Sequence, residues 1–258
     1  MKRLMETTAV AFSMFSALPM PQFQWNKENM RYAMCAFPFI GFVIGGGVWV
    51  WSVLCYGLKF GTVLCAAGFT LIPLLITGGI HLDGLCDTAD ALASHAPVEK
   101  KLEILKDPHL GAFGAMSLAA YLLLQFALFT ELAVTTTALW CLALGFAVSR
   151  TLSGFAVATF PCAKNSGLLH TFADHTSKVR VRVVLGAFMA ILSAALLVLA
   201  GWYGAVVLGG ALVLFLFYYV LSMRYFGGIT GDLAGWFLQL CEIGMLGVLV
   251  LAQKLLPL

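Results

Sequence analysis

Long apolar runs separated by short polar segments dominate this chain of 258 residues. Each run is close to the roughly 20 residues that a helix needs to cross the hydrocarbon core of a bilayer. The runs are continuous rather than alternating, which favours helical spans over the strands of a barrel. We therefore expect seven membrane spans, at residues 33–57, 61–80, 111–130, 132–150, 183–201, 204–223 and 234–252.

The apolar stretch at the N-terminus, residues 5–20, is short and is ended by Pro19 and Pro21. We interpret it as an interfacial or re-entrant helix. A full extra span, with the N-terminus outside, is the alternative. The basic start resembles a signal peptide but lacks a convincing small-residue cleavage site, so we expect the segment to be retained.

The composition agrees with a membrane protein. Hydrophobic residues make up 61% of the chain and charged residues 10%, whereas a soluble domain is about 45–50% apolar and about 25% charged. The sequence therefore predicts an all-α, polytopic integral membrane helix bundle, with residues 1–258 forming one membrane-embedded catalytic domain in the lipid bilayer. The net charge of +3 is small and no large basic cluster occurs, so we expect no nucleic-acid partner.

Cysteine and glycine add little chemistry. The seven cysteines show no CxxC or Cys/His spacing, so we expect neither a disulfide framework nor a zinc site. Gly41, Gly45, Gly46 and Gly47 resemble the small-residue faces through which membrane helices pack. Local helix flexibility without a packing partner is the open alternative.

The basic residues indicate an orientation. Lys and Arg gather in alternate connections, and the positive-inside rule makes that side cytoplasmic. Three polar segments, 81–110, 161–182 and 224–233, then share the cytoplasmic side. They contain every aspartate of the chain, namely Asp83, Asp87, Asp90, Asp107, Asp174 and Asp232.

The densest acidic group lies between His81 and Asp90. If residues 81–92 form a helix, the spacing of Asp83, Asp87 and Asp90 places all three carboxylates on one face. Neighbouring carboxylates about 6 Å apart repel by about 3 kcal/mol at an effective dielectric constant near 20. Such a face must be hydrated, partly protonated or neutralised by a cation, and oxygen ligands suit Mg²⁺ or Mn²⁺. A solvated helix end without metal is the alternative.

Residues around this face are candidates for substrate contacts. Gly84 would let a phosphate or a second helix approach closely. His81 is either a base or a hydrogen-bonded structural residue. The amphipathic segment 99–111 is either a phosphate-facing lid or an interfacial helix with snorkelling lysines; its lysines are Lys100, Lys101 and Lys106.

A second glycine-rich element runs from Gly227 to Asp232. Its glycines, Gly228 among them, could expose backbone N–H groups to an anion. Asp232 could cap the last span or bind metal. Glu242 lies deeper in the same apolar span, where capping does not explain it.

These residues together resemble the cobalamin synthase family, adenosylcobinamide-GDP ribazoletransferase. The similar strings are GGIHLDGLCDTADAL from Gly78, KLEILKDPHLG from Lys101, GGITGDLAGWFLQLCEI from Gly227 and FSMFSALPMP from Phe12. They occur in the family's order and cover essentially the whole chain. Two positions depart from the family pattern: Ala91 stands where many members have Gly, and Ala17 where many have a basic residue.

The resemblance implies a polytopic, Mg²⁺-dependent membrane enzyme. It would join adenosylcobinamide-GDP to α-ribazole or its 5′-phosphate, with the ribazole 5′-oxygen attacking the diphosphate and GMP leaving. By position, Asp83, Asp87 and Asp90 would hold the metal, and Asp232 and Glu242 match the family's C-terminal acidic motif. These three aspartates and His81 are then the candidate catalytic residues. The candidate substrate-binding residues are Lys100, Lys101, Lys106, Gly84 and Gly228.

The expected location is the cell (inner) membrane, with the active site facing the cytoplasm. Further expected partners are a second copy of the chain or other cobalamin-assembly enzymes. The main alternative is a CDP-alcohol phosphotransferase, but the Ala-Arg that should follow Asp83-Gly84 is missing. An intramembrane prenyltransferase would want a second Asp-rich motif. A transporter would want its acids near the bilayer midplane.

Overall fold

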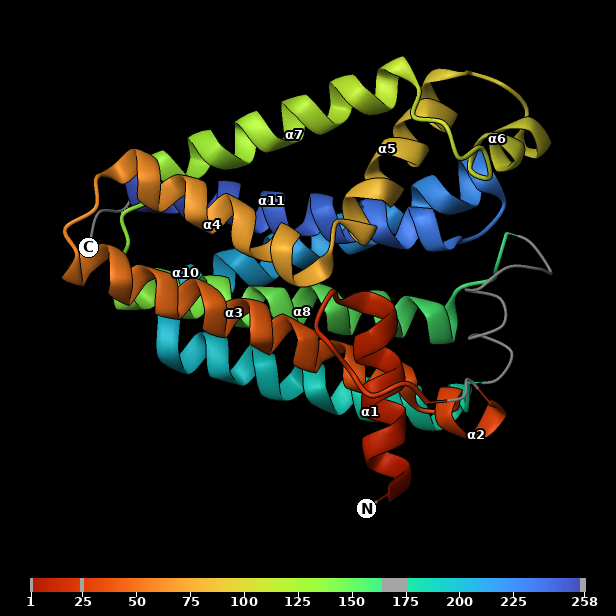
Figure 1. The fold of residues 1–258 in the computed structure, drawn as a ribbon, viewed down its shortest axis with the longest axis horizontal. Coiled ribbons are helices and arrows are strands. Elements are labelled where there is room, and N and C mark those ends of the chain that lie inside the picture. Colours follow the sequence, from red (N-terminus) through yellow and green to blue (C-terminus); the bar gives the residue numbers. More distant parts are fainter. Residues whose placement is uncertain (1, 24–25, 164–175, 256–258) are drawn as a thin grey trace.

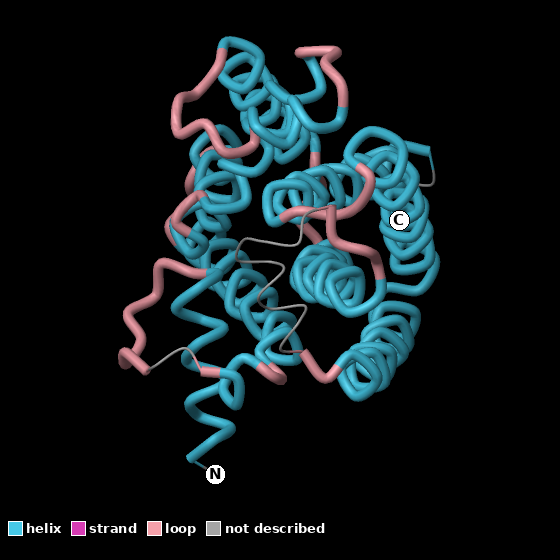
Figure 2. Tube along the Cα trace, turned by 90° about the vertical axis from the view of Figure 1, so that its right-hand side faces the viewer, coloured by secondary structure: helices cyan, strands magenta, loops and turns pink. Residues whose placement is uncertain are grey.

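The computed structural model describes residues 2–23, 26–163 and 176–255, and all the regular elements in these ranges are helices. The helices are α1 (Lys2–Phe15), α2 (Lys27–Met30), α3 (Ala33–Gly57), α4 (Thr62–Thr77), α5 (Ile80–Ala93), α6 (Val98–Ile104), α7 (Ala112–Glu131), α8 (Thr136–Thr159), α10 (Lys178–Phe226) and α11 (Gly231–Leu255). The long helices run side by side in Figure 1, and Figure 2 views them end-on. The predicted all-α bundle is confirmed.

Five described helices are long and apolar enough to cross a membrane: α3, α7, α8, α10 and α11. Helices α4 and α5 pass the same test only as a pair, which is bent by 94°. Counting that pair once gives six spans. Apart from α5, which lies in the polar segment expected at 81–110, these helices coincide with apolar runs expected from the sequence.

Helix α10 accounts for two of the expected runs. Its 49 residues would form a rod about 74 Å long, more than twice the roughly 30 Å of a bilayer core. The helix breaks at Gly201, where φ is 54° and ψ is −127°. A Cβ on Gly204 would collide with the backbone oxygen of Leu196, so the chain folds back on itself at this break. The two halves run in opposite directions in Figure 1. When they are counted as separate spans, the total rises from six to the predicted number of about seven.

Helices α8 and α11 form the centre of the bundle. In their most apolar stretches 89% and 78% of the residues are buried, against 22% for α7 and α10. Helix α3 packs closely on α8, and glycine makes this possible. A Cβ on Gly45 would lie 2.7 Å from the Cα of Ala143, and one on Gly41 would collide with the carbonyl of Phe146. The packing interpretation of Gly41 and Gly45 is therefore confirmed, whereas Gly46 faces open space.

Two helices lie across the bundle instead of along it (Figure 1). Helix α5 turns away from α4 through Gly78 and Gly79, whose φ angles of 65° and 81° suit glycine. Helix α1 has 14 residues and is about 21 Å long, which is shorter than a bilayer core of roughly 30 Å. Helix α1 by itself is therefore too short to cross the membrane, and the interfacial or re-entrant interpretation stays a prediction.

The segment that follows α1 is tied to the bend between α4 and α5. The N–H of Ala17 donates to the carbonyl of Ile76 over 2.8 Å. The seven cysteines are free in the structure. Helices α2 and α6 lie at the same end of the bundle (Figure 1), and the candidate site is at this end.

Candidate active site at the α5 carboxylates

Helix α5 spans Ile80–Ala93, which confirms that residues 81–92 are helical. Its first turn is closed by the N–H of Asp83 donating to the carbonyl of Gly79 over 3.0 Å. The Asp83 residue is exposed, and Asp87 and Asp90 are half-buried. The i,i+4 spacing of Asp83 and Asp87 puts both carboxylates on the same face.

Acidic groups from separate segments converge on Asp87. The charges of Asp83, Asp232, Asp90 and Asp107 all act on its carboxyl group. They come from α5, from the connection after α6 and from the first turn of α11. Segments 81–110 and 224–233 therefore meet at one end of the bundle, as expected. Asp174 lies outside the described residues.

Two glycines allow the backbone of α5 to cross very close to the backbone at the start of α11. A Cβ on Gly84 would lie 2.5 Å from the carbonyl oxygen of Asp232. A Cβ on Gly235 would lie 3.2 Å from the Cα and the carbonyl oxygen of His81. Of the two roles considered for Gly84, the structure therefore shows the close approach of a second helix.

The first turn of α11 is capped by Thr230 and not by Asp232. The hydroxyl of Thr230 accepts a hydrogen bond from the N–H of Leu233 over 3.2 Å, which is the usual geometry of an N-cap. The same hydroxyl donates to Oδ2 of Asp232 over 3.4 Å. Asp232 therefore sits beside the cap, and its charge acts on the carboxyl group of Asp87.

Asp90 has backbone partners at the start of α7. Its Oδ2 accepts from the N–H of Gly111 and its Oδ1 from the N–H of Gly114, both over 2.9 Å. A carboxylate is stabilised at this position because the first N–H groups of a helix lack partners and the helix dipole is positive there. Asp90 thus joins α5 to α7, in addition to the metal-binding role predicted for it.

His81 lies away from the carboxylate face. It is only 4% exposed and its ring meets the ring of Phe37 edge-on, with centroids 6.0 Å apart. Its Nε2 has no hydrogen-bond partner among the described residues. Two residues along a helix correspond to a rotation of about 200°, so His81 and Asp83 point to opposite sides of α5. The structure does not bring this histidine to the acids.

The three lysines differ in their surroundings. Lys101 is buried, and its Nζ lies 5.0 Å from the ring centroid of Tyr225 at the end of α10. Lys100 is exposed and forms an ion pair of 2.9 Å with Glu103, and Lys106 is exposed. Lys101 therefore docks α6 on α10, while the other two lysines remain on the surface.

The glycine-rich turn is joined to the residues that directly follow α8. A Cβ on Gly228 would lie 2.5 Å from the amide nitrogen of Ala163. The N–H of Ala163 donates to Ile229, and the N–H of Ile229 donates to Pro161, both over 2.9 Å. The glycine is thus required for backbone packing, and the anion-binding role predicted for Gly228 would have to coexist with it.

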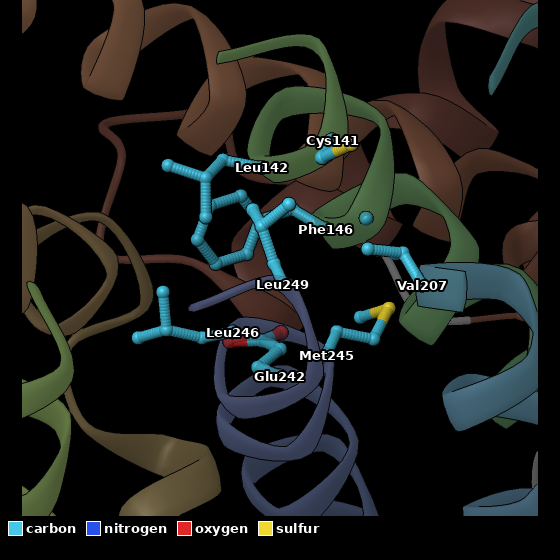
Figure 3. Close-up of a pocket in the computed structure, with 9 residues that line it drawn as sticks. Cys141, Leu142, Phe146, Val207, Glu242, Met245, Leu246 and Leu249 are labelled. Carbon is cyan, nitrogen blue, oxygen red and sulfur yellow. The ribbon is translucent and has the colours of Figure 1, made fainter. Parts of the chain in front are cut away.

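Glu242 is paired with an arginine that the sequence interpretation missed. Nη1 of Arg150 donates to Oε1 of Glu242 over 2.6 Å, and the hydroxyl of Ser149 donates to the same oxygen over 3.1 Å. Arg150 is fully buried inside α8. The Glu242 side chain also borders a cavity of about 20 Å³ between α8, α10 and α11 (Figure 3). Glu242 is therefore engaged inside the bundle, apart from the α5 acids.

The pairing of Arg150 with Glu242 could have been predicted from the sequence. Charged residues in membrane spans are rare and usually find a partner on another span. Arg150 closes one expected span and Glu242 lies inside another, so the two opposite charges could have been matched. The expected span ended at 150 because a charge is there, whereas α8 continues to Thr159.

The acidic side chains of the site fit magnesium only if water or the substrate supplies further ligands. No group of three or more His, Cys, Asp and Glu side chains within the described ranges is placed to hold a metal ion by itself. Mg²⁺ commonly binds one or two carboxylates together with water and substrate phosphates. The face of α5 that carries Asp83 and Asp87, where several like charges lie close together, suits such an ion better than a closed protein site.

Comparisons with known proteins cover almost the whole chain. The family model described as cobalamin-5-phosphate synthase matches residues 7–250. A protein of Lachnoclostridium phytofermentans named adenosylcobinamide-GDP ribazoletransferase is 43% identical over 245 residues, which are 95% of this chain and 93% of that protein. One of the same name from Clostridium perfringens is 32% identical over 253 residues, 97% of this chain and 99% of that protein. No solved structure matches the chain significantly.

Proposed function

The chain belongs to the cobalamin-5-phosphate synthase family, and on that premise we propose that it joins adenosylcobinamide-GDP to α-ribazole or α-ribazole 5′-phosphate. The products are adenosylcobalamin, or its 5′-phosphate, and GMP. The observation that carries this proposal is the α5 face, where Asp83 and Asp87 lie beside Asp232 at one end of a membrane bundle. A diphosphate substrate with a bound cation would neutralise that charge.

We propose Asp83 and Asp87 as the residues that hold Mg²⁺, with Asp232 next to them. Asp90 is a weaker candidate because both its oxygens accept backbone hydrogen bonds. Glu242 is weaker because one of its oxygens is committed to Arg150. When bound, Mg²⁺ would neutralise the charge that the diphosphate and the leaving GMP bring to the acidic face.

The protein's own groups have three tasks in the reaction. The α5 face orients the diphosphate so that the phosphorus bonded to the corrinoid side faces the ribazole. Exposed Lys100 and Lys106 add positive charge beside the departing GMP. An α5 aspartate takes the proton of the attacking hydroxyl, because His81 is buried on the other side of the helix.

The identity of the attacking oxygen depends on the substrate. With α-ribazole 5′-phosphate the 5′-oxygen is already esterified, so it cannot form the new bond. Another ribose hydroxyl must then attack the phosphorus. The same hydroxyl would attack when the substrate is unphosphorylated α-ribazole. We therefore replace the expected attack by the 5′-oxygen with attack by this other hydroxyl for both substrates.

We also propose that the enzyme is in the cell membrane with the α5 end facing the cytoplasm. The Lys and Arg distribution supports this orientation. The anionic nucleotide substrates could then reach the site without crossing the bilayer. A second copy of the chain, or other cobalamin-assembly enzymes, remain predicted partners.

The direct test uses the protein in lipid nanodiscs. It is incubated with adenosylcobinamide-GDP, α-ribazole 5′-phosphate and Mg²⁺, and GMP and the corrinoid product are separated by chromatography. Equal amounts of the two products are expected. Release of CMP from a CDP-alcohol, without GMP in the first mixture, would contradict the proposal and favour a CDP-alcohol phosphotransferase.

A further inference from the structure

A small polar cavity lies inside the bundle, where α4, α5, α7, α8 and α11 meet. Its volume is about 10 Å³, comparable with the space that one water molecule requires. The polar residues that line it on the last three of these helices are Tyr121, Gln125, Arg150, Gln239 and Glu242. Ionisable residues in membrane spans are costly and mark functional positions by default.

The polar groups around the cavity are not fully paired. Arg150 uses Nη1 for Glu242 and for the carbonyl of Phe146. Its Nε and Nη2, Oε2 of Glu242 and the hydroxyl of Tyr121 have no hydrogen-bond partner in the described part of the chain. All three side chains are more than nine-tenths buried. Buried polar groups without partners are costly, so a small polar ligand in the cavity would be favourable.

The charge balance selects the ligand. Arg150 and Glu242 already neutralise each other, so an added ion would leave a net charge in a medium of low dielectric constant. A water molecule is neutral and can accept from the guanidinium while it donates to the free carboxylate oxygen. It can also bond to the hydroxyl of Tyr121. Water in buried sites typically makes about three such hydrogen bonds.

The cavity borders two of the helices that carry the candidate active site, α5 and α11. Thr77 of α4 and Leu82 of α5, which flank the bend between these helices, contribute to its lining. Glu242 is ten residues beyond Asp232 on α11, about 15 Å along the same helix. Gly84 and Gly235 hold α5 against the start of α11, so a displacement at Arg150 would shift the helices that carry the acids.

We propose that this cavity is a water-binding site, and that the bound water completes a network of Arg150, Glu242 and Tyr121 which fixes how α5 crosses α11. Arg150 is then a positioning residue for the active site and does not touch the substrate. The water site stands by itself, whereas the positioning role rests on the proposed transferase function. The two parts are therefore tested separately.

The water is tested by X-ray hydroxyl-radical footprinting of the full chain in lipid nanodiscs, which labels buried side chains next to bound water. Tyr218 is the comparison residue, because it is also buried and its hydroxyl also lacks a partner in the described structure, but it is not among the residues that line the cavity next to Tyr121. Tyr121 should be modified at least about fivefold faster than Tyr218. Equal rates at the two tyrosines would overturn the water site.

The positioning role is tested by kinetics of GMP release. The pair Arg150→Gln with Glu242→Gln removes both charges together, and Tyr121→Phe removes one hydroxyl. We expect kcat to fall about tenfold in the double variant and about threefold in Tyr121→Phe, with each KM within about twofold of the wild type. Tyr218→Phe should keep the wild-type kcat, and Tyr121→Phe carries the test if the double variant does not fold.

Wild-type kcat in folded Tyr121→Phe and double variants would overturn the positioning role. A rise in KM at constant kcat would also overturn it, because that result indicates lost substrate contacts instead of displaced reacting groups. If the wild-type protein releases no GMP, the proposed function fails, while the footprinting result still decides whether the cavity holds water.

Discussion

Helices α5 and α8 both place ionisable side chains in an apolar chain, and their electrostatic situations are opposite. On α5 the carboxylates of Asp83 and Asp87 lie at the end of the bundle and are surrounded by further acids. On α8 Arg150 is fully buried, yet its charge is matched by Glu242 at 2.6 Å. The comparison teaches that burial alone does not identify a binding site. Like charges gathered at one place are the stronger sign, because another molecule can neutralise them.

The largest expected effect breaks the matched pair. Arg150→Met would leave Glu242 as an unpaired charge inside the bundle and should destabilise the protein by about 3–5 kcal/mol. Reversible unfolding in mixed detergent micelles would measure it. The double variant Arg150→Met with Glu242→Gln is the control and should recover most of the loss. Equal stability of the single and double variants would mean that the pair has no energetic role.

The next effect concerns the unmatched acids. Asp87→Asn should lower GMP release by about 10²–10³-fold, because it removes a carboxylate from the face that we propose binds the cation and the diphosphate. The unfolding temperature should stay constant or rise, since repulsion from Asp83 and Asp232 is relieved. Glu131→Gln changes a single exposed acid on α7 and should keep nearly full activity. Near-normal turnover of Asp87→Asn would place the cation elsewhere.

The contact between α5 and α11 can be tightened. Gly84→Ala would push a methyl group to within 2.5 Å of the Asp232 carbonyl and should cost about 1–3 kcal/mol of stability. It should lower turnover as well. Gly46→Ala is the matched control because that glycine is also helical but faces open space, and it should be neutral or stabilising by up to about 1 kcal/mol. Similar effects of the two substitutions would argue against the close crossing.

The smallest effect separates two roles of Asp90. Asp90→Ala removes both acceptors at the start of α7 and should cost about 0.5–2 kcal/mol, as the loss of a helix cap does. If Asp90 only anchors α7, Asp90→Asn should retain turnover to within about tenfold, because its amide oxygen can still accept one N–H bond. A loss as large as that of Asp87→Asn would instead assign Asp90 to the metal.

Much of the fold could be predicted because it follows from local pattern. The span at 33–57 coincides with α3, and the helix around Asp83 follows from the residues themselves. The turn at Gly201 was also implicit in the separation of two apolar runs. These features depend on neighbours in the sequence and on the thickness of a bilayer.

The contacts that define the site could not be predicted in the same way. Asp90 meets Gly111 and Gly114, and Gly84 meets Asp232, only after distant segments fold together. The pair of Arg150 and Glu242 was missed because the span was ended at the charge. Its partner lies 92 residues later, and the stability of a buried charge depends on that partner.

The reversal inside α10 has a consequence for how the protein enters the membrane. Its tip, from Gly201 to Gly204, contains only Trp and Tyr between the two glycines and no charged residue. Translocation of a polar loop is the step that makes insertion of paired spans costly, and charged residues dominate that cost. The two halves of α10 can therefore enter the bilayer together as one hairpin. A reporter placed at this tip to map the outer side would alter the segment whose insertion it is meant to record.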